Sequence, residues 1–192
     1  MQQPIEKFSQ WLAEAKANAA IKEPTAMTLA TVSADGKPGA RTVLLKDHGA
    51  NGFTFYTNFT SRKGSELKQN PHASLCFYWM PLDRQVIIEG TVSPVADAEA
   101  DAYFASRPRA RQLAAWASLQ SQPLVSRETL DARVVEMDAK FAGGDVPRPP
   151  HWSGWCLNPS RIEFLELSQV RLHVRELYQL QHGVWQHGLL YP

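Results

Sequence analysis

In the stretch Arg41-Thr42-Val43-Leu44-Leu45-Lys46, a cation stands at each end of an aliphatic run typical of a β-strand. Side chains alternate between the two faces of a strand, so the two cations are expected to face opposite ways. A turn signalled by Gly49, Asn51 and Gly52 leads into a second run, Phe53-Thr54-Phe55-Tyr56-Thr57. The pattern predicts a strand–turn–strand unit whose charged ends belong to a site rather than to the core alone.

A helix is predicted to start just after this unit, in Thr60-Ser61-Arg62-Lys63-Gly64-Ser65-Glu66-Leu67. The first turn of a helix has free backbone N–H groups, which together with Arg62 and Lys63 could hold a phosphate. The alternative is that both cations are solvated charges at a helix end, which is the norm for Lys and Arg. Taken alone, an Arg-Lys pair favours that alternative.

The remaining pattern predicts an antiparallel β-structure with packed helices. Short turns join the predicted strands, as at Asp35-Gly36 and His182-Gly183, whereas a parallel sheet would need helical crossovers. Helices are expected over 5–20 and, in three pieces, over 96–141; strands are expected over 27–33, 40–47, 72–80, 84–93, 155–157, 161–167, 171–180 and 184–189.

Composition limits the function classes. A chain of 192 residues with a net charge of +1 has no electrostatic basis for binding nucleic acid or an anionic membrane. The N-terminal residues do not form a signal peptide, and no apolar run is long enough to span a bilayer, so a soluble, cytoplasmic protein is expected. Cys76 and Cys156 lack metal-ligand spacing and are expected to be reduced, buried thiols.

Three further groups of residues could carry chemistry. Tyr103 and Arg107 are four apart and would share a helix face, where a phenol and a guanidinium could meet a phosphate. If 171–180 is a strand, alternation places Arg171, His173 and Arg175 on one face. For Tyr103 and Arg107, the alternative is a helix C-terminus that Arg107 stabilises through the helix dipole. For Arg171, His173 and Arg175, the alternative is an exposed strand face, where solvated charges have no desolvation penalty. Gln85, Gln120 and Ser121 could bind a heterocycle or could simply be solvated.

The chain resembles the pyridoxamine 5′-phosphate oxidase family of flavin mononucleotide (FMN) enzymes from roughly Pro24 to Pro192. The resemblance rests on many short motifs in the family's order. They are Arg41 to Lys46, Phe55-Tyr56-Thr57-Asn58, Ser61-Arg62-Lys63, Arg84-Gln85-Val86, Tyr103 to Pro108, Trp116 to Ser121, Val146-Pro147-Arg148-Pro149, Ile162-Glu163-Phe164 and Arg171-Leu172-His173.

The resemblance implies an α+β fold that is mainly antiparallel β, an FMN-binding split barrel of the Greek-key type. It implies one domain over 1–192, with an N-terminal helix in 1–23, a helical insertion over 96–142 and C-terminal strands over 151–192. It also implies a homodimer with FMN sites at the subunit interface. The positions that match FMN contacts of the family are Arg41, Thr42, Val43, Leu44, Leu45, Lys46, Tyr56, Thr57, Arg62, Lys63, Gln85, Gln120, Ser121 and Arg175.

For the substrate, the resemblance implies a phosphorylated B6 vitamer that is oxidised with O2 to pyridoxal 5′-phosphate and hydrogen peroxide. Lys46, Tyr103 and Arg107 would hold its phosphate, while Arg171 and His173 would lie against the ring and the carbon being oxidised. Arg171 is expected to polarise the substrate and His173 to orient it, which makes them the candidate catalytic residues. No residue is identified as the proton acceptor.

Four departures from the family pattern surround the ligands. Arg111 replaces a serine that binds phosphate, Leu165 replaces a tryptophan that contacts FMN, and Val174 replaces an acidic residue. An upstream segment that covers the active site in family members is expected to have no counterpart before Ile5. These departures bear on the substrate more than on flavin binding, and Arg111 itself is expected to contact the substrate phosphate.

Two alternatives to the B6 oxidase remain at this stage. One is a split-barrel FMN oxidase with another substrate, such as the related oxidases of phenazine biosynthesis. The other is a protein that binds flavin or pyridoxal phosphate without turnover. A barrel without any ligand would require all these cations to be solvated surface charges that bind nothing.

Overall fold

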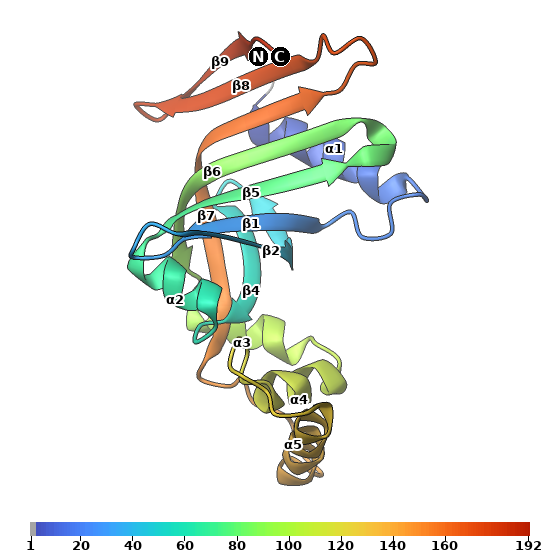
Figure 1. Cartoon of the computed structure of the whole chain (residues 1–192), viewed down its shortest axis with the longest axis vertical. Helices are drawn as coiled ribbons and strands as arrows, with labels where there is room; N and C mark the ends of the chain where they lie inside the picture. The colour runs from blue at the N-terminus through green and yellow to red at the C-terminus, as the bar shows by residue number, and fades with distance from the viewer. Residues whose placement is uncertain (1–2) are drawn as a thin grey trace.

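The computed structural model describes residues 3–192, so the first two residues of the predicted N-terminal segment 1–23 lie outside the described residues. A single antiparallel sheet curls around one core; the N-terminal helix packs against this core, and three later helices gather at one end of the sheet (Figure 1). The helices and strands are α1 Pro4–Ala17, β1 Ala26–Val32, β2 Pro38–Leu44, β3 Asp47–Gly49, β4 Gly52–Asn58, α2 Arg62–Gln69, β5 His72–Trp79, the 3-10 helix η1 Met80–Leu82, β6 Arg84–Pro94, α3 Asp97–Ala105, α4 Arg109–Ala117, α5 Arg127–Lys140, β7 Trp152–Glu166, β8 Val174–Gln181 and β9 Val184–Leu190.

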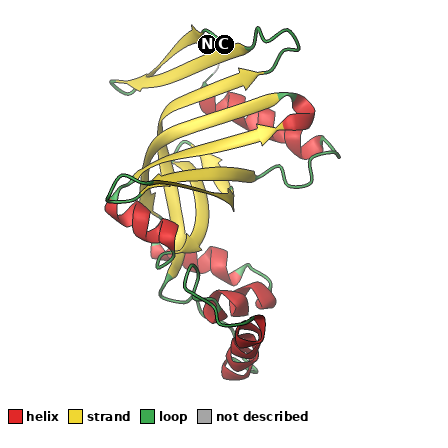
Figure 2. Ribbon diagram, in the orientation of Figure 1, coloured by secondary structure: helices red, strands yellow, loops and turns green. Residues whose placement is uncertain are grey.

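The sheet confirms the predicted antiparallel architecture. Its strands run in the order β2-β1-β5-β6-β7-β4-β3, with β8 and β9 added beside β7. Figure 2 shows the strands forming the curved body of the molecule, with α3, α4 and α5 gathered at one end of it. The strand–turn–strand unit read from the sequence is formed by β2 and β4, with the short strand β3, which the sequence did not predict, between them.

One prediction about the strands is wrong. The sequence suggested separate strands over 155–157 and 161–167, whereas β7 is a single strand of 15 residues. Its first half pairs with β4 and its second half with β8, while β6 follows its other edge. Pro159 is accommodated by a bulge at Glu89/Gly90, where a Cβ on Gly90 would lie 2.0 Å from the Asn158 carbonyl oxygen.

A second prediction about the strands is also wrong. β8 begins at Val174, so Arg171 and His173 precede it and do not share a strand face with Arg175. Arg171 has a φ of +59° in the connection, and the backbone N–H of Ser168 donates to Nδ1 of His173 at 2.9 Å. This side chain–backbone contact stabilises a turn at the point where alternation predicted a continuous strand.

Two hydrophobic clusters form the interior. The larger one lies inside the curled sheet and includes Phe8 of α1, which makes edge contacts with Phe53 and Phe77. The smaller one joins α3, α4 and α5 to the start of β7 through Phe104 and Trp152. The two cores meet near β4, and the candidate site lies at that junction.

Candidate functional site

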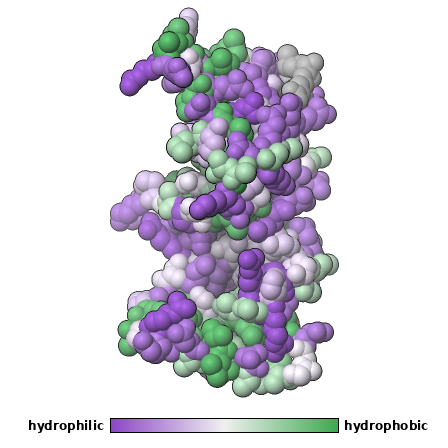
Figure 3. Space-filling model, turned by 90° about the vertical axis from the view of Figure 1, so that its right-hand side faces the viewer, coloured by the Kyte–Doolittle hydropathy of each residue, from purple (hydrophilic) through white to green (hydrophobic). Residues whose placement is uncertain are grey.

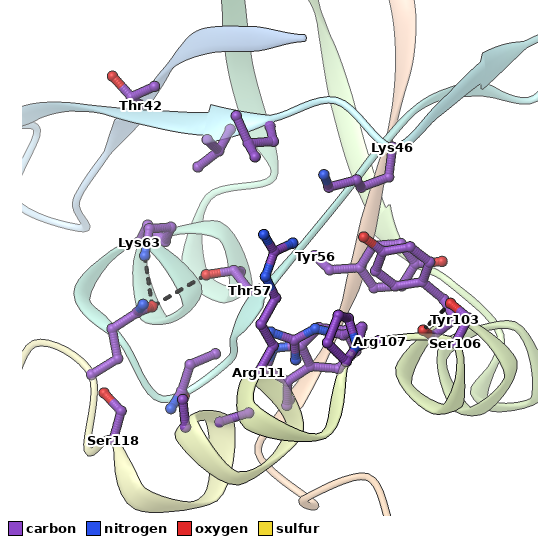
Figure 4. A pocket seen from close by; sticks show the side chains of 18 residues that line it. Thr42, Lys46, Tyr56, Thr57, Lys63, Tyr103, Ser106, Arg107, Arg111 and Ser118 are labelled. Atoms are coloured by element: carbon purple, nitrogen blue, oxygen red, sulfur yellow. Dashed lines mark hydrogen bonds between the residues drawn. The ribbon is translucent and has the colours of Figure 1, made fainter. Parts of the chain in front are cut away.

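A cavity of about 590 Å³ opens between β2, β4 and the helices α3 and α4 (Figure 4). Its volume is in the usual range for small-molecule sites. Eleven of the residues singled out from the sequence line it. They are Thr42, Val43, Leu44, Lys46, Tyr56, Thr57, Lys63, Tyr103, Arg107, Arg111 and Gln120.

The N-terminus of α2 supplies one cationic wall of the cavity. Ser61 caps the helix by accepting a hydrogen bond from the Gly64 N–H at 3.3 Å. Lys63 donates to the side-chain oxygen of Gln120 at 2.8 Å, and Thr57 donates to the same oxygen at 3.3 Å. Burial, followed by the nearby charge of Arg41, lowers the pKa of Lys63. A cation held beside free helix N–H groups suits an anion.

Unlike Lys63, Arg41 and Arg62 do not line the cavity. Both pair with the buried carboxylate of Glu66, at 2.9 Å and 2.8 Å. Burial opposes ionisation of Glu66, but hydrogen bonds from Thr31, Arg62 and Arg41 outweigh it and lower its pKa. β2 ends at Leu44, so Lys46 follows the strand and its direction does not follow from strand alternation; of the two cations, Lys46 lines the cavity and Arg41 does not.

The α3–α4 corner supplies the second cationic wall. α3 ends at Ala105, so Arg107 lies in the connection rather than on the helix face predicted from its spacing to Tyr103, yet both residues line the cavity. Figure 4 shows Arg111 rising from α4 toward the middle of the cavity, beside Arg107. No carboxylate of the described residues pairs with either guanidinium.

Burial and the charges of this corner shift the pKa of its members. Burial, and then the neighbouring charge of Arg111, lower the pKa of Arg107 against the opposing effect of Tyr103. Burial raises the pKa of Tyr103, although Arg107 and Arg111 act against it. Tyr103 is therefore a neutral hydroxyl donor near pH 7. Lys46, Arg107, Arg111 and this hydroxyl can together receive an anion with more than one charge.

The other predicted residues lie elsewhere. Gln85, Leu165 and Arg175 are cross-strand neighbours in one row of β6, β7 and β8. Arg171 and His173 lie in the connection that enters β8, near that row. None of these residues lines the cavity, and Figure 1 shows β8 and the α3–α5 helices at opposite ends of the molecule. Leu45 is buried in the core, and Ser121, with a φ of +73°, lies in the loop that follows α4.

Sequence reasoning missed two residues. Trp152 is the first residue of β7 and lines the cavity, and its only sequence signal is an aromatic residue shortly after the Pro149-Pro150 connector. Glu66 orients Arg41 and Arg62, and its spacing of four residues from Arg62 could have indicated the pair. Cys76 and Cys156 are free thiols, as predicted, and both are half-buried. Among residues 3–192, no helix is long and apolar enough to cross a lipid bilayer.

Comparisons with known proteins cover nearly the whole chain. Residues 13–141 match the family described as pyridoxamine 5′-phosphate oxidase, and residues 152–192 match the pyridoxine 5′-phosphate oxidase C-terminal dimerisation region. Relatives named pyridoxine/pyridoxamine 5′-phosphate oxidase include one from Myxococcus xanthus (strain DK1622), 56% identical over 98% of this chain and 91% of the relative. Another, from Zymomonas mobilis, is 50% identical over 100% and 99%.

Solved structures agree on the fold. PhzG from Burkholderia lata 383, crystallised with tetrahydrophenazine-1-carboxylic acid, is 35% identical, with a TM-score of 0.93 over 100% of this chain and 94% of that one. A pyridoxamine 5′-phosphate oxidase-related, FMN-binding protein from Nostoc punctiforme is 17% identical, with a TM-score of 0.78 over 100% of both chains. The second likeness concerns the fold alone.

Proposed function

Because the chain belongs to the pyridoxamine 5′-phosphate oxidase family, we propose that it oxidises pyridoxine 5′-phosphate and pyridoxamine 5′-phosphate to pyridoxal 5′-phosphate with FMN and O2. The observation that carries this proposal is the cavity with two cationic walls. One wall, at the N-terminus of α2, suits the phosphate of FMN, and the other, at the α3–α4 corner, suits the phosphate of a substrate.

The residues present fit FMN. Lys63 and the free N–H groups of α2 would hold its phosphate, with Thr57 and Gln120 beside them and the 42–46 backbone along the flavin. When bound, FMN would accept the hydride from the C4′ carbon of the substrate and pass the electrons to O2, which yields hydrogen peroxide.

The substrate phosphate would be bound by Lys46, Tyr103, Arg107 and Arg111. Because Arg107 and Arg111 lack a carboxylate partner among the described residues, their charge is available to an anion. Binding a phosphate remote from the reacting carbon orients that carbon, and this lowers the entropic part of the barrier. Arg171 would polarise the oxygen or amine on C4′, and His173 would orient it.

The separation of the two residue groups supports a homodimer with shared sites. Within one subunit, neither Gln85 nor Arg175 lines the cavity, and Figure 1 shows β8 and the helices α3–α5 at opposite ends of the molecule. A two-fold interface would bring the row of each subunit to the cavity of the other. Residues 152–192, which match the dimerisation region, expose apolar side chains such as Val184 and Leu189. Figure 3 shows green, hydrophobic residues at the end where these strands lie.

The test is aerobic turnover of pyridoxine 5′-phosphate by purified protein supplied with FMN. The absorbance of the aldehyde product and hydrogen peroxide should appear together in equal amounts. A flavin-loaded protein that yields neither would contradict the proposed oxidase.

A second candidate is an FMN oxidase acting on a phenazine precursor. It is favoured by the TM-score of 0.93 to PhzG, although that protein is only 35% identical, against 50% and more for the relatives named after the B6 substrates. Turnover of a reduced phenazine carboxylic acid without turnover of B6 phosphates would select this candidate.

A further inference from the structure

Trp152 lies at the centre of the aromatic cluster behind the α3–α4 corner. It is 7% exposed and lines the cavity from the first position of β7. Its ring is nearly parallel to that of Tyr56 at a centroid distance of 5.2 Å and to that of Tyr103 at 6.2 Å. Phe104 meets its edge at 5.1 Å. Trp152 therefore supports the wall that carries the candidate phosphate ligands.

Arg107 is held against this indole and not against a carboxylate. Its guanidinium carbon lies 4.7 Å from the Trp152 ring and 5.4 Å from the Phe104 ring. Its Nη1 atom is buried and has no hydrogen-bond partner among the described residues. A cation–π contact fixes a guanidinium by its face, so the N–H donors at its edge stay available.

The neighbouring Arg148 shows the contrasting arrangement. It pairs with Asp97 at 2.8 Å and Asp101 at 2.6 Å, and it donates to the Trp152 backbone carbonyl at 2.9 Å. The carboxylates of α3 thus anchor the start of β7 from outside the cavity. On the cavity side of the same tryptophan, the Arg107 guanidinium lies against the Trp152 and Phe104 rings and forms no ion pair with the residues that the structure describes.

We propose that Trp152 is a positioning residue for the substrate phosphate: its indole presents the Arg107 guanidinium to the phosphate with its charge not neutralised by any carboxylate. The proposal rests on the proposed function for the identity of the anion. A carboxylate in the place of the indole would also fix Arg107, but it would compete with the phosphate for the same donors. The indole orients the cation without this competition.

The test measures binding of 4′-deoxypyridoxine 5′-phosphate, which lacks the oxidisable hydroxyl, to the FMN-loaded protein by calorimetry. The variant Trp152→Leu should weaken binding about tenfold, and Trp152→Phe less, because a cation binds an indole better than a benzene ring. The same measurement with Arg107→Met as the background decides the mechanism. Without the guanidinium, Trp152→Leu should change the dissociation constant less than twofold.

A merely structural role gives a different result. It would weaken binding equally in both backgrounds and would lower the FMN content, and equal weakening would overturn the proposal. Unchanged binding by Trp152→Leu, or no binding by the unsubstituted protein, would overturn it too. If Trp152→Leu does not fold, the conservative Trp152→Phe carries the comparison. Failure of the proposed function appears separately, as absence of turnover of pyridoxine 5′-phosphate.

Discussion

Arg111 adds a cation to the cavity where the family resemblance leads one to expect a serine. Its guanidinium stands beside Arg107 and contributes to lowering the pKa of that residue after burial. The two neighbouring positive charges repel each other unless an anion lies between them. The pair therefore favours a doubly charged phosphate over a singly charged anion.

Replacing Arg111 with Ser should raise the KM for pyridoxine 5′-phosphate about fivefold to tenfold, with a smaller effect on kcat. The reason is that a charge-assisted hydrogen bond is exchanged for a neutral one. Arg111→Lys keeps the charge, so its KM should lie between those of Arg111→Ser and the unsubstituted enzyme. The exposed Arg127→Ser, on α5, is the control for loss of a cation outside the cavity. Equal KM values for Arg111→Ser and the unsubstituted enzyme would remove Arg111 from the phosphate site.

A second residue-scale prediction concerns His48, which connects β3 to α1. Its ring packs on Phe8 at 5.1 Å and hydrogen-bonds with Ser9 Oγ at 2.9 Å. Burial lowers its pKa, so below pH about 6.5 the unfolded chain binds a proton that the folded chain does not. Its contribution to stability is therefore complete above that pH and decreases as pH falls toward the lower, folded pKa.

Thermal unfolding at a series of pH values checks this sign. The melting temperature should fall between pH 7 and pH 5.5, and His48→Gln should show a smaller fall because the titrating ring is gone. The same substitution at the exposed His72 is the matched control. A fall as steep in His48→Gln as in the unsubstituted protein would contradict the assignment.

At the scale of elements, α2 combines a structural cap with an anion site. Ser61 is fully buried, accepts from the Gly64 N–H and donates to the Asn58 carbonyl at 2.6 Å. Its hydroxyl also accepts from Lys63 at 3.4 Å. The cap therefore fixes both the helix start and the cation that faces the cavity.

Replacing Ser61 with Ala should cost about 1–2 kcal/mol of stability and also weaken FMN binding. Ser126 caps α5 through the Thr129 N–H at 3.3 Å, away from the cavity, and provides the control. Ser126→Ala should lower stability without changing the dissociation constant of FMN, as measured by flavin fluorescence. The expectation for α2 is contradicted if Ser61→Ala, like Ser126→Ala, leaves the dissociation constant of FMN unchanged.

At the scale of the whole molecule, a shared site predicts complementation between subunits. Arg107→Met damages the cavity, and Arg171→Leu damages the group near β8, so each homodimer should be nearly inactive. In a heterodimer one of the two sites combines both defects and the other has none. A random mixture should regain about a quarter of the unsubstituted activity, because half of the dimers are mixed and half of their sites are intact.

The control for complementation is a pair of variants from the same group. Arg107→Met mixed with Lys46→Ala leaves a defect in every cavity, so activity should stay low. Absence of recovery with Arg171→Leu would show that each site is built from one subunit. Recovery in this control would show that Lys46 and Arg107 do not act in the same cavity.

By itself, the sequence determined the local structure and the chemistry. Alternation predicted the strands around Arg41 to Lys46, and the helix start at Ser61 and the antiparallel sheet followed from turn residues and periodicity. These features depend on neighbours in the chain, so a single sequence is enough to predict them.

Only the tertiary structure decided which cations reach the cavity. Arg41 and Lys63 are both predicted FMN contacts, yet the buried Glu66 binds Arg41 from 25 residues away in the chain, whereas Lys63 faces Gln120. Likewise, β7 is one strand because β4 and β8 pair with its two halves. Such choices depend on partners far apart in the chain, and burial sets their strength, because an unpaired charge in the interior is costly.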